Sequence, residues 1–268
     1  MKSDLAGDFS ARIAAYQATA EHNDRLFAEF TAMTWADADR ATHRRHVEAG
    51  QLGFGDPAFH ALWAGLLATA HERFGRLDVL EIGVFKGQVI SLWALLARIH
   101  DWPVHIHAIT PLAGQPLPRF GWWRSVLYRL SPRFRERVKS GDFYAAEDYE
   151  AIVRAHFARH GLDFGRVCLL RGFSTAADIR EAVAKDRFHV IYIDGDHTYD
   201  GARADILHYA PKVVPGGWLV MDDAAFDQPG TSFWKGYETV ARACLLLPGL
   251  GFKNVINIGH NRVFERVG

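Results

Sequence analysis

From residue 78 onward, short runs of β-branched and other apolar residues alternate with longer segments of helical periodicity. The β-rich runs are DVLEI, VHIHAI, RVCLL, HVIYID and GWLVMD. Such alternation is typical of parallel βαβ units whose helices cover both faces of one sheet. Two more β-rich runs, FKNVINI and RVFERV, are joined by the short GHN and predict a hairpin that completes one edge. The sequence therefore predicts an α/β protein with a doubly wound, mostly parallel sheet.

The chain before this alternating region has a different pattern. Apolar residues recur at helical spacing in FHALWAGLLATAHERF, and loop signals stand around GQLGFGDP. We interpret residues 1–75 as an N-terminal helical cap and residues 76–268 as the α/β domain. A segment rich in arginine and aromatic residues, at about 111–145, interrupts that domain between its second and third strands.

This insertion follows the carboxyl end of a strand, which is where ligands bind in open α/β sheets. It is therefore either a lid over a ligand or a solvated, partly helical loop whose Trp122 and Trp123 pack on the body. Its basic side chains could accept an anionic substrate, or they could form a solvated charged face. These are Arg119, Arg124, Arg129, Arg133, Arg135, Arg137 and Lys139.

Composition narrows the class of partner and the compartment. Lysine plus arginine equals aspartate plus glutamate at 31 each, so no overall field favours nucleic acid or a membrane surface. No apolar stretch is long enough to span a bilayer, and the first residues do not resemble a secretory signal. Cys168 and Cys244 stand among apolar residues, which predicts buried thiols in a reducing compartment. We expect a cytoplasmic protein with a small-molecule partner, and the sequence leaves a homo-oligomer open.

A glycine turn follows the first predicted strand, in EIGVFKG. Gly83 and Gly87 let the backbone turn tightly and approach a ligand, and the following helix start offers free N–H groups to an anion. The dehydrogenase fingerprint would need glycine where Glu81 stands and an acid where Thr110 stands. A nicotinamide dinucleotide is therefore not favoured, and a plain strand-to-helix turn stays open as the simpler interpretation.

Acidic residues end two strands that we expect to be neighbours. Asp194 follows HVIYI, and Asp222 and Asp223 follow WLVM. Adjacent parallel strands lie about 4.8 Å apart, so their carboxyl ends would bring three carboxylates into one crevice. A hard divalent cation such as Mg²⁺ suits such a set, and His197 could carry a proton beside it.

Simpler interpretations exist for each of these residues. An aspartate after a strand is often a helix cap or turn former, and Asp200 and Asp205 fit that role. The spacing in DGDHTYDG excludes an EF-hand. We interpret His105 and His107 as packed or surface residues, and HRRH at 43–46 as a solvated helix face.

Four segments together resemble the class I S-adenosylmethionine-dependent methyltransferases. They are VLEIGVFKGQVISLW, LLRGFSTAADI, HVIYIDGDHTYDGARADILHYAPKVVPGGWLVMDD and GHNRVF. The resemblance covers about residues 78–266. It is nearest to the metal-dependent branch that includes macrocin O-methyltransferase and the cephalosporin-hydroxylase-like proteins.

This resemblance implies a Rossmann-like methyltransferase fold with seven strands, the last of them antiparallel, and S-adenosylmethionine across the ends of the first three strands. Glu81, Gly83 and Gly87 match the loop that holds the methionine part of the cofactor, and Phe173 and Ser174 match the turn near the adenine. Asp194, Asp222 and Asp223 match metal ligands, for Mg²⁺ or another divalent cation. His197 matches the general base, with Asp196 as an alternative base or a supporting residue. Thr110 departs from the pattern, because most relatives place an acid there for the ribose.

The implied reaction is O-methylation of a hydroxyl on a sugar or a glycosylated natural product. Three alternatives stay open: a metal-independent small-molecule methyltransferase, an enzyme that uses a different nucleotide cofactor, and a noncatalytic cofactor-binding protein of the same fold.

Overall fold

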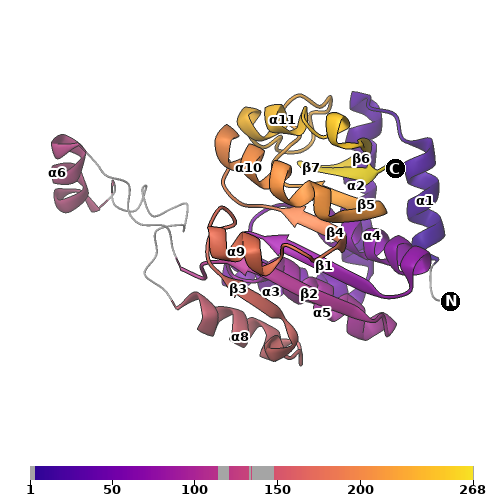
Figure 1. Ribbon diagram of the computed structural model, residues 1–268, viewed down its shortest axis with the longest axis horizontal. Coiled ribbons are helices and arrows are strands. Elements are labelled where there is room, and N and C mark those ends of the chain that lie inside the picture. Colours follow the sequence, from indigo (N-terminus) through magenta and orange to yellow (C-terminus); the bar gives the residue numbers. More distant parts are fainter. Residues whose placement is uncertain (1–3, 114–120, 133, 135–147, 268) are drawn as a thin grey trace.

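The strands form one mixed sheet in a computed structural model that describes residues 4–113, 121–132, 134 and 148–267. Within these residues the sheet has seven strands in the order β3-β2-β1-β4-β5-β7-β6 (Figure 1). The first five are parallel, and β7 runs antiparallel to both β5 and β6. The strands are β1 Leu77–Ile82, β2 Val104–Thr110, β3 Cys168–Arg171, β4 Phe188–Ile193, β5 Val213–Met221, β6 Phe252–Ile258 and β7 Asn261–Arg266. The predicted doubly wound sheet and its C-terminal hairpin are confirmed.

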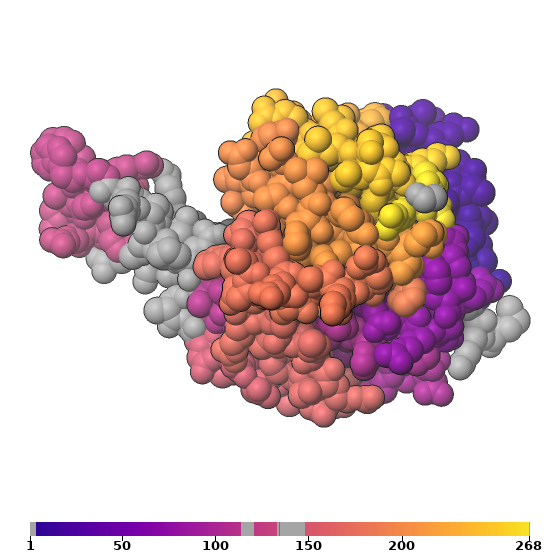
Figure 2. All heavy atoms as spheres, in the orientation of Figure 1, coloured from indigo at the N-terminus to yellow at the C-terminus, as the bar shows by residue number. Residues whose placement is uncertain are grey.

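Helices cover both faces of this sheet. They are α1 Leu5–Ala15, α2 Ala20–Ala36, α3 Ala38–Gly50, α4 Ala58–Phe74, α5 Gln88–His100, α6 Trp122–Leu130, α8 Tyr149–Arg159, α9 Ala177–Ala182, α10 Tyr199–Tyr209 and α11 Glu238–Cys244. One core joins α1, α2, α4, α5 and α8 to the sheet, and a second joins α9, α10 and α11 to its other face. In Figure 2 the orange and yellow segments from α9 onward cover much of the face shown.

Several helices begin at side chains suited to cap them. Asp37 accepts a hydrogen bond from the Arg40 amide at the start of α3, and Asp148 accepts one from the Ala151 amide at the start of α8. Thr198 accepts from the Gly201 amide at the start of α10. Such caps satisfy amides that have no partner within the helix, so the sequence sets these helix starts locally.

The N-terminal helices are present, and they share a core with the sheet. Every residue of α4 from Ala58 to Ala70 is buried, because α4 lies between the sheet and the pair α1 and α2. Phe9 of α1 and Phe30 of α2 belong to the same core as Val79 of β1. These helices therefore add a further layer to that face of the sheet.

Two side-chain predictions are wrong. HRRH is not a solvated helix face, because His43 is fully buried and Arg44 is 5% exposed; α4 and α8 cover this side of α3. Cys168 is exposed, because it begins the short edge strand β3, whereas Cys244 is buried as predicted.

The arginine-rich insertion falls partly outside the described residues, which exclude Arg119, Arg133, Arg135, Arg137 and Lys139. Its described helix α6 lies away from the body, on the side of the sheet where the parallel strands end (Figure 1). Trp122 and Trp123 are 69% and 65% exposed and stack on each other at 4.2 Å, so they do not pack on the body. None of the described helices has both the length and the apolar composition to cross a membrane.

Candidate active site

A cavity of about 1050 Å³ opens at the carboxyl ends of the parallel strands. This is the end of the sheet where ligands bind in doubly wound folds. Its wall combines strand ends with the loop before α4 and the turn of the C-terminal hairpin. The lining includes residues 52–56, 81–85, 109–113, 172–175, 194–197, 222–223, 232–234 and His260.

Five of the six predicted cofactor residues line this cavity: Glu81, Gly83, Thr110, Phe173 and Ser174. Gly87 does not line it. It is the N-cap of α5 with φ 88°, and a Cβ there would lie 3.0 Å from Val153 of α8. Gly87 therefore allows α8 to pack closely against the turn that supports the cavity wall.

Gly83 lies where the carboxyl ends of β1 and β4 come close together. Its φ is 97°, a conformation that favours glycine, and an added Cβ would lie 1.8 Å from the carbonyl oxygen of Asp194. The Asp194 amide in turn donates to the Ile82 carbonyl at 2.9 Å. Glycine at this position thus lets β1 and β4 approach closely enough to bring Asp194 beside the turn.

Glu81 is a buried acid with unused hydrogen-bonding capacity. It is 1% exposed, and its Oε2 has no partner among the described residues. Burial first, and then the charge of Asp194, raise the pKa of Glu81 well above its ordinary value. A buried carboxylate of this kind is stabilised by a cation, and the ammonium group of an amino-acid ligand would supply one.

The opposite part of the cavity is suited to a flat ring. Phe173 is 61% exposed and presents its ring at the wall. Asp205 of α10 is 1% exposed, and its Oδ1 has no partner among the described residues. Burial raises the pKa of Asp205 to about 6. Between these parts, the Thr110 hydroxyl accepts from the Leu112 amide at 3.2 Å, so it forms a turn and keeps its own proton to donate.

The three predicted metal-binding aspartates meet at one edge of the sheet. Residues 190–193 of β4 pair in parallel with residues 218–221 of β5, so Asp194 and Asp222 follow neighbouring strand ends. Burial, and then the charges of Asp222 and Asp223, raise the pKa of Asp194 well above its ordinary value. Burial and Asp222 likewise raise the pKa of Asp223 to about 7. These shifts mark a concentration of negative charge that a bound cation would relieve.

His197 lies beside these carboxylates. Its Nε2 is 3.2 Å from Oδ2 of Asp223 and 3.5 Å from Oδ1 of Asp194, which are ion-pair distances. The ring stacks on Tyr237 at 4.7 Å with an interplanar angle of 20°. The backbone around it is held too, because the Thr239 hydroxyl donates to the His197 carbonyl at 2.5 Å. His197 therefore presents a nitrogen to the aspartates from a restrained position.

Asp196 forms the turn that starts α10. Its Oδ1 accepts from the Thr198 amide and its Oδ2 from the Thr198 hydroxyl, each at 2.9 Å. With both oxygens engaged by Thr198, the geometry favours a turn-forming role for Asp196 over that of a base.

His260 was missed in the sequence and is one of the most buried site residues, at 4% exposed. Its Nε2 lies 3.2 Å from Oδ1 of Asp222, and its Nδ1 lies 3.4 Å from Oδ2 of Asp56. Burial alone would lower the pKa of His260, but these two carboxylates outweigh burial and raise it well above its ordinary value. In return, His260 outweighs the burial of Asp222 and keeps the pKa of that carboxyl below its ordinary value.

One ligand atom from each of Asp222, Asp223 and His260 lies within 4.8 Å of the other two. The structure thus offers a second donor set beside the three predicted aspartates, with two members in common. The available signal in the sequence was the polar GHN turn in a hairpin at the edge of the sheet.

Asp223 has a strained backbone. Its φ is 52°, in the left-handed region that residues other than glycine seldom adopt. The Tyr237 amide donates to its carbonyl at 2.9 Å, and Gly236 packs so closely that a Cβ there would lie 2.0 Å from that oxygen. Such a conformation persists where the surroundings impose it, and in this conformation Oδ2 of Asp223 lies 3.2 Å from Nε2 of His197.

Comparison with known proteins identifies the domain. The family model described as a methyltransferase domain matches residues 80–224, and no curated protein matches the chain. The O-methyltransferase NovP is 20% identical, with a TM-score of 0.50 over 74% of this chain and 76% of its own. A proposed caffeoyl-CoA O-methyltransferase from Staphylococcus aureus is 14% identical, with a TM-score of 0.54 over 87% of this chain and 93% of its own. The calicheamicin methyltransferase CalS11 is 15% identical, with a TM-score of 0.51 over 94% of this chain and 96% of its own. At these identities the likeness concerns the fold.

Proposed function

The chain belongs to the methyltransferase-domain family and is a class I methyltransferase dependent on S-adenosylmethionine; we propose that it methylates a hydroxyl group, with a divalent cation, on a sugar or a glycosylated small molecule. One observation carries this proposal. Two neighbouring strand ends bring Asp194, Asp222 and Asp223 together beside His197, in the same cavity as the predicted cofactor residues.

The cavity residues fit the cofactor in its chemistry. S-adenosylmethionine supplies an electrophilic methyl group on its sulfonium. Glu81, whose Oε2 has no partner among the described residues, would hold the ammonium of the methionine part, and Gly83 leaves room for the backbone to approach. Phe173 would cover one face of the adenine, and Oδ1 of Asp205, which is also without a partner in the described part of the chain, would accept from its amino group.

The acidic edge fits a divalent cation. Three carboxylates crowd together here, and desolvation together with their mutual repulsion raises the pKa of Asp194 and of Asp223. Asp194, Asp222 and Asp223 would hold the ion, and His260 would orient Asp222 from behind, as outer partners of metal ligands do. A bound divalent cation lowers the pKa of a coordinated hydroxyl.

His197 would take the proton of the acceptor hydroxyl. Its Nε2 faces the carboxylate edge where the acceptor oxygen would be bound, and Asp223 at 3.2 Å would stabilise the protonated ring. Stacking on Tyr237 holds the ring in this orientation. The acidic edge and His197 would also contribute by positioning the acceptor hydroxyl, because methyl transfer to oxygen requires an in-line approach.

The ion pair between His260 and Asp222 supports a second candidate, a metal-independent small-molecule methyltransferase. His260 already supplies a positive partner to the acidic edge. His197 would then act as base without a cation. The two candidates differ in one measurable respect, which is the response of turnover to a chelator.

The deciding experiment is a methyl-transfer assay with S-adenosylmethionine and a panel of sugar-bearing acceptors, followed by mass spectrometry of the products. Activity that is lost in chelator and restored by Mg²⁺ or Mn²⁺ supports the metal-dependent reaction. Full activity in chelator contradicts the metal role. Asp222→Ala should abolish metal-dependent turnover and keep cofactor binding. Asp200→Ala, an exposed aspartate in the first turn of α10, is the matched control.

A further inference from the structure

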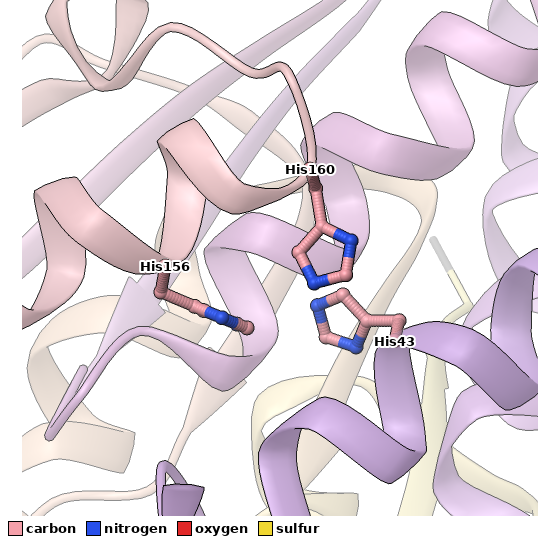
Figure 3. A group of neighbouring side chains, drawn as sticks. All are labelled: His43, His156 and His160. Carbon is pink, nitrogen blue, oxygen red and sulfur yellow. The ribbon is translucent and has the colours of Figure 1, made fainter.

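A group of five histidines lies between α3, α4 and α8, apart from the active-site acids. His43 and His46 come from α3, His60 from α4, and His156 from α8, with His160 directly after that helix. The His43 ring centroid lies 5.0 Å from that of His156 and 4.8 Å from that of His160, and the last two are 5.3 Å apart. Figure 3 shows these three rings gathered at the junction of the two helices.

The ring nitrogens are close enough to share one ion. One nitrogen from each of His43, His156 and His160 lies within 4.8 Å of the other two. Two Zn–N bonds of about 2.0–2.1 Å span roughly 4 Å at most, so small rotations of the rings would close the site. His156 and His160 stand four residues apart, a spacing that places two side chains on one side of a helix.

His156 is a buried imidazole whose nitrogens lack hydrogen-bond partners among the described residues. It is 1% exposed, and neither Nδ1 nor Nε2 has a hydrogen-bond partner in the described part of the chain. His160 Nε2 is likewise without a partner there. Buried polar atoms are normally satisfied, so an imidazole with both nitrogens unmet indicates a missing ligand.

Both ring nitrogens of His43 have polar partners, so binding an ion would require the ring to give up one of them. Its Nδ1 lies 2.9 Å from Nε2 of His60, and its Nε2 lies 2.9 Å from the Ser91 hydroxyl. That hydroxyl also lies 2.6 Å from the Gly87 carbonyl and 3.0 Å from the Gln88 carbonyl, so it keeps partners if His43 turns to an ion. His60 then acts as the outer partner that fixes the ring of a metal-binding histidine.

The donors select the class of metal. Three imidazoles without a carboxylate suit Zn²⁺ among the common cations and do not suit Mg²⁺ or Ca²⁺. We propose that His43, His156 and His160 form a Zn²⁺ site whose fourth position is open to water.

This zinc site would join α3 to α8. The structural consequence lies at the active-site wall, because Tyr149 of α8 lines the cavity and Val153 packs against Gly87. The ion would therefore hold in place the helix that directly follows the insertion. The proposal does not depend on the reaction or on a cation at the aspartates.

The test is metal binding to the whole protein after treatment with a chelator. Isothermal titration with ZnCl₂ should show a site that Asp222→Ala/Asp223→Ala leaves intact and that His160→Ala and His156→Ala remove. His60→Gln should weaken Zn²⁺ affinity about 10–100-fold, as expected for an outer partner. His208→Ala, a half-buried histidine on α10, is the matched control and should bind Zn²⁺ like the parent chain.

Co²⁺ gives an independent readout. The parent protein should show the intense visible bands of four-coordinate Co²⁺, and His160→Ala should lose them. His160 is only half-buried, so this variant decides the question if His156→Ala does not fold. Zinc binding that both histidine variants retain overturns the proposal, as does an absence of binding beyond what the two aspartates provide.

Discussion

His260 Nε2 lies 3.2 Å from Oδ1 of Asp222, and this contact joins the turn of the C-terminal hairpin to the end of β5. The neighbouring Asp56 approaches Nδ1 of the same ring at 3.4 Å. The imidazole lies between two carboxylates that both line the cavity, and it holds Asp222 against the end of β5. His260 is thus the positioning residue of the acidic edge, and Asp56 supports it from the loop before α4.

The first prediction concerns this pair. His260→Ala should weaken divalent-cation affinity about 10–100-fold, because Asp222 loses the partner that orients it. Asp56→Asn should act in the same direction and more weakly. Titration calorimetry with Mn²⁺ measures both, and S-adenosylhomocysteine affinity serves as the control for the folded cavity. Unchanged Mn²⁺ affinity in His260→Ala would remove His260 from the metal site.

The second prediction tests His197 as the base. His197→Gln should lower kcat by about 10²–10⁴-fold, the usual contribution of a general base, and leave cofactor affinity unchanged. Tyr237→Phe keeps the aromatic ring that stacks on His197 and should keep the rate. Steady-state kinetics with a confirmed acceptor give the answer. A rate within twofold of the parent for His197→Gln is the outcome that excludes this role.

Glu81→Gln should lower the affinity for the cofactor without lowering the stability of the ligand-free protein. Replacing the buried acid removes a desolvated carboxylate, so the melting temperature of the ligand-free protein should stay the same or rise. Cofactor affinity should fall about tenfold or more, because a hydrogen bond to a charged group contributes about 1.5–3 kcal/mol. Thermal melts and calorimetry with S-adenosylhomocysteine measure the two effects. Equal affinity in the two proteins would contradict the assignment of Glu81 to the ammonium.

Gly83→Ala should be strongly destabilising, by more than about 1 kcal/mol, since alanine is strained at positive φ and its Cβ would overlap the Asp194 carbonyl oxygen. Gly249→Ala is the matched control, because a Cβ there meets nothing within 4 Å. Urea denaturation compares their free energies of unfolding. A Gly83→Ala protein as stable as the control would show that β1 and β4 can separate without cost.

The raised pKa of Asp205 predicts how the free energy of unfolding changes with pH. Its pKa is about 6 in the folded protein, above the ordinary 3.8, so the folded state binds more protons between these values. The contribution of Asp205 to stability is therefore greatest below about pH 4 and is lost as the pH rises through 6. At about 1.4 kcal/mol per pKa unit, the loss is at most about 3 kcal/mol.

Asp205→Asn should remove this slope, so the difference in unfolding free energy between variant and parent should grow from pH 4 to pH 7. Denaturation curves across that range measure it, and the subtraction cancels the contributions of the other buried acids. A difference that does not vary with pH would mean that Asp205 titrates normally.

The sequence predicted those parts of the molecule that depend on local pattern. Alternating β-rich and helical segments indicated the sheet, and parallel strands necessarily end at one edge, so Asp194 and Asp222 could be brought together without coordinates. The same reasoning could not find His260. Its place depends on β7 inserting between β5 and β6, which is a long-range pairing with no local signal.

The histidine group also could not be predicted from local sequence patterns. His43 lies in a charged run that favours a solvated helix face, and only the packing of α4 and α8 over α3 buries it. The spacing of His156 and His160 was visible in the sequence, but nothing local linked it to a helix more than a hundred residues earlier. Both the place of His260 at the acidic edge and the histidine group depend on contacts between elements that are distant in the sequence.

The insertion of β7 between β5 and β6 also has a consequence for synthesis. The turn that carries His260 reaches Asp222 only once the hairpin has paired with β5, so a nascent chain still lacking this hairpin has an unfinished acidic edge. Until the hairpin pairs with β5, the Asp222 carboxylate would lack the His260 ring that holds it in place.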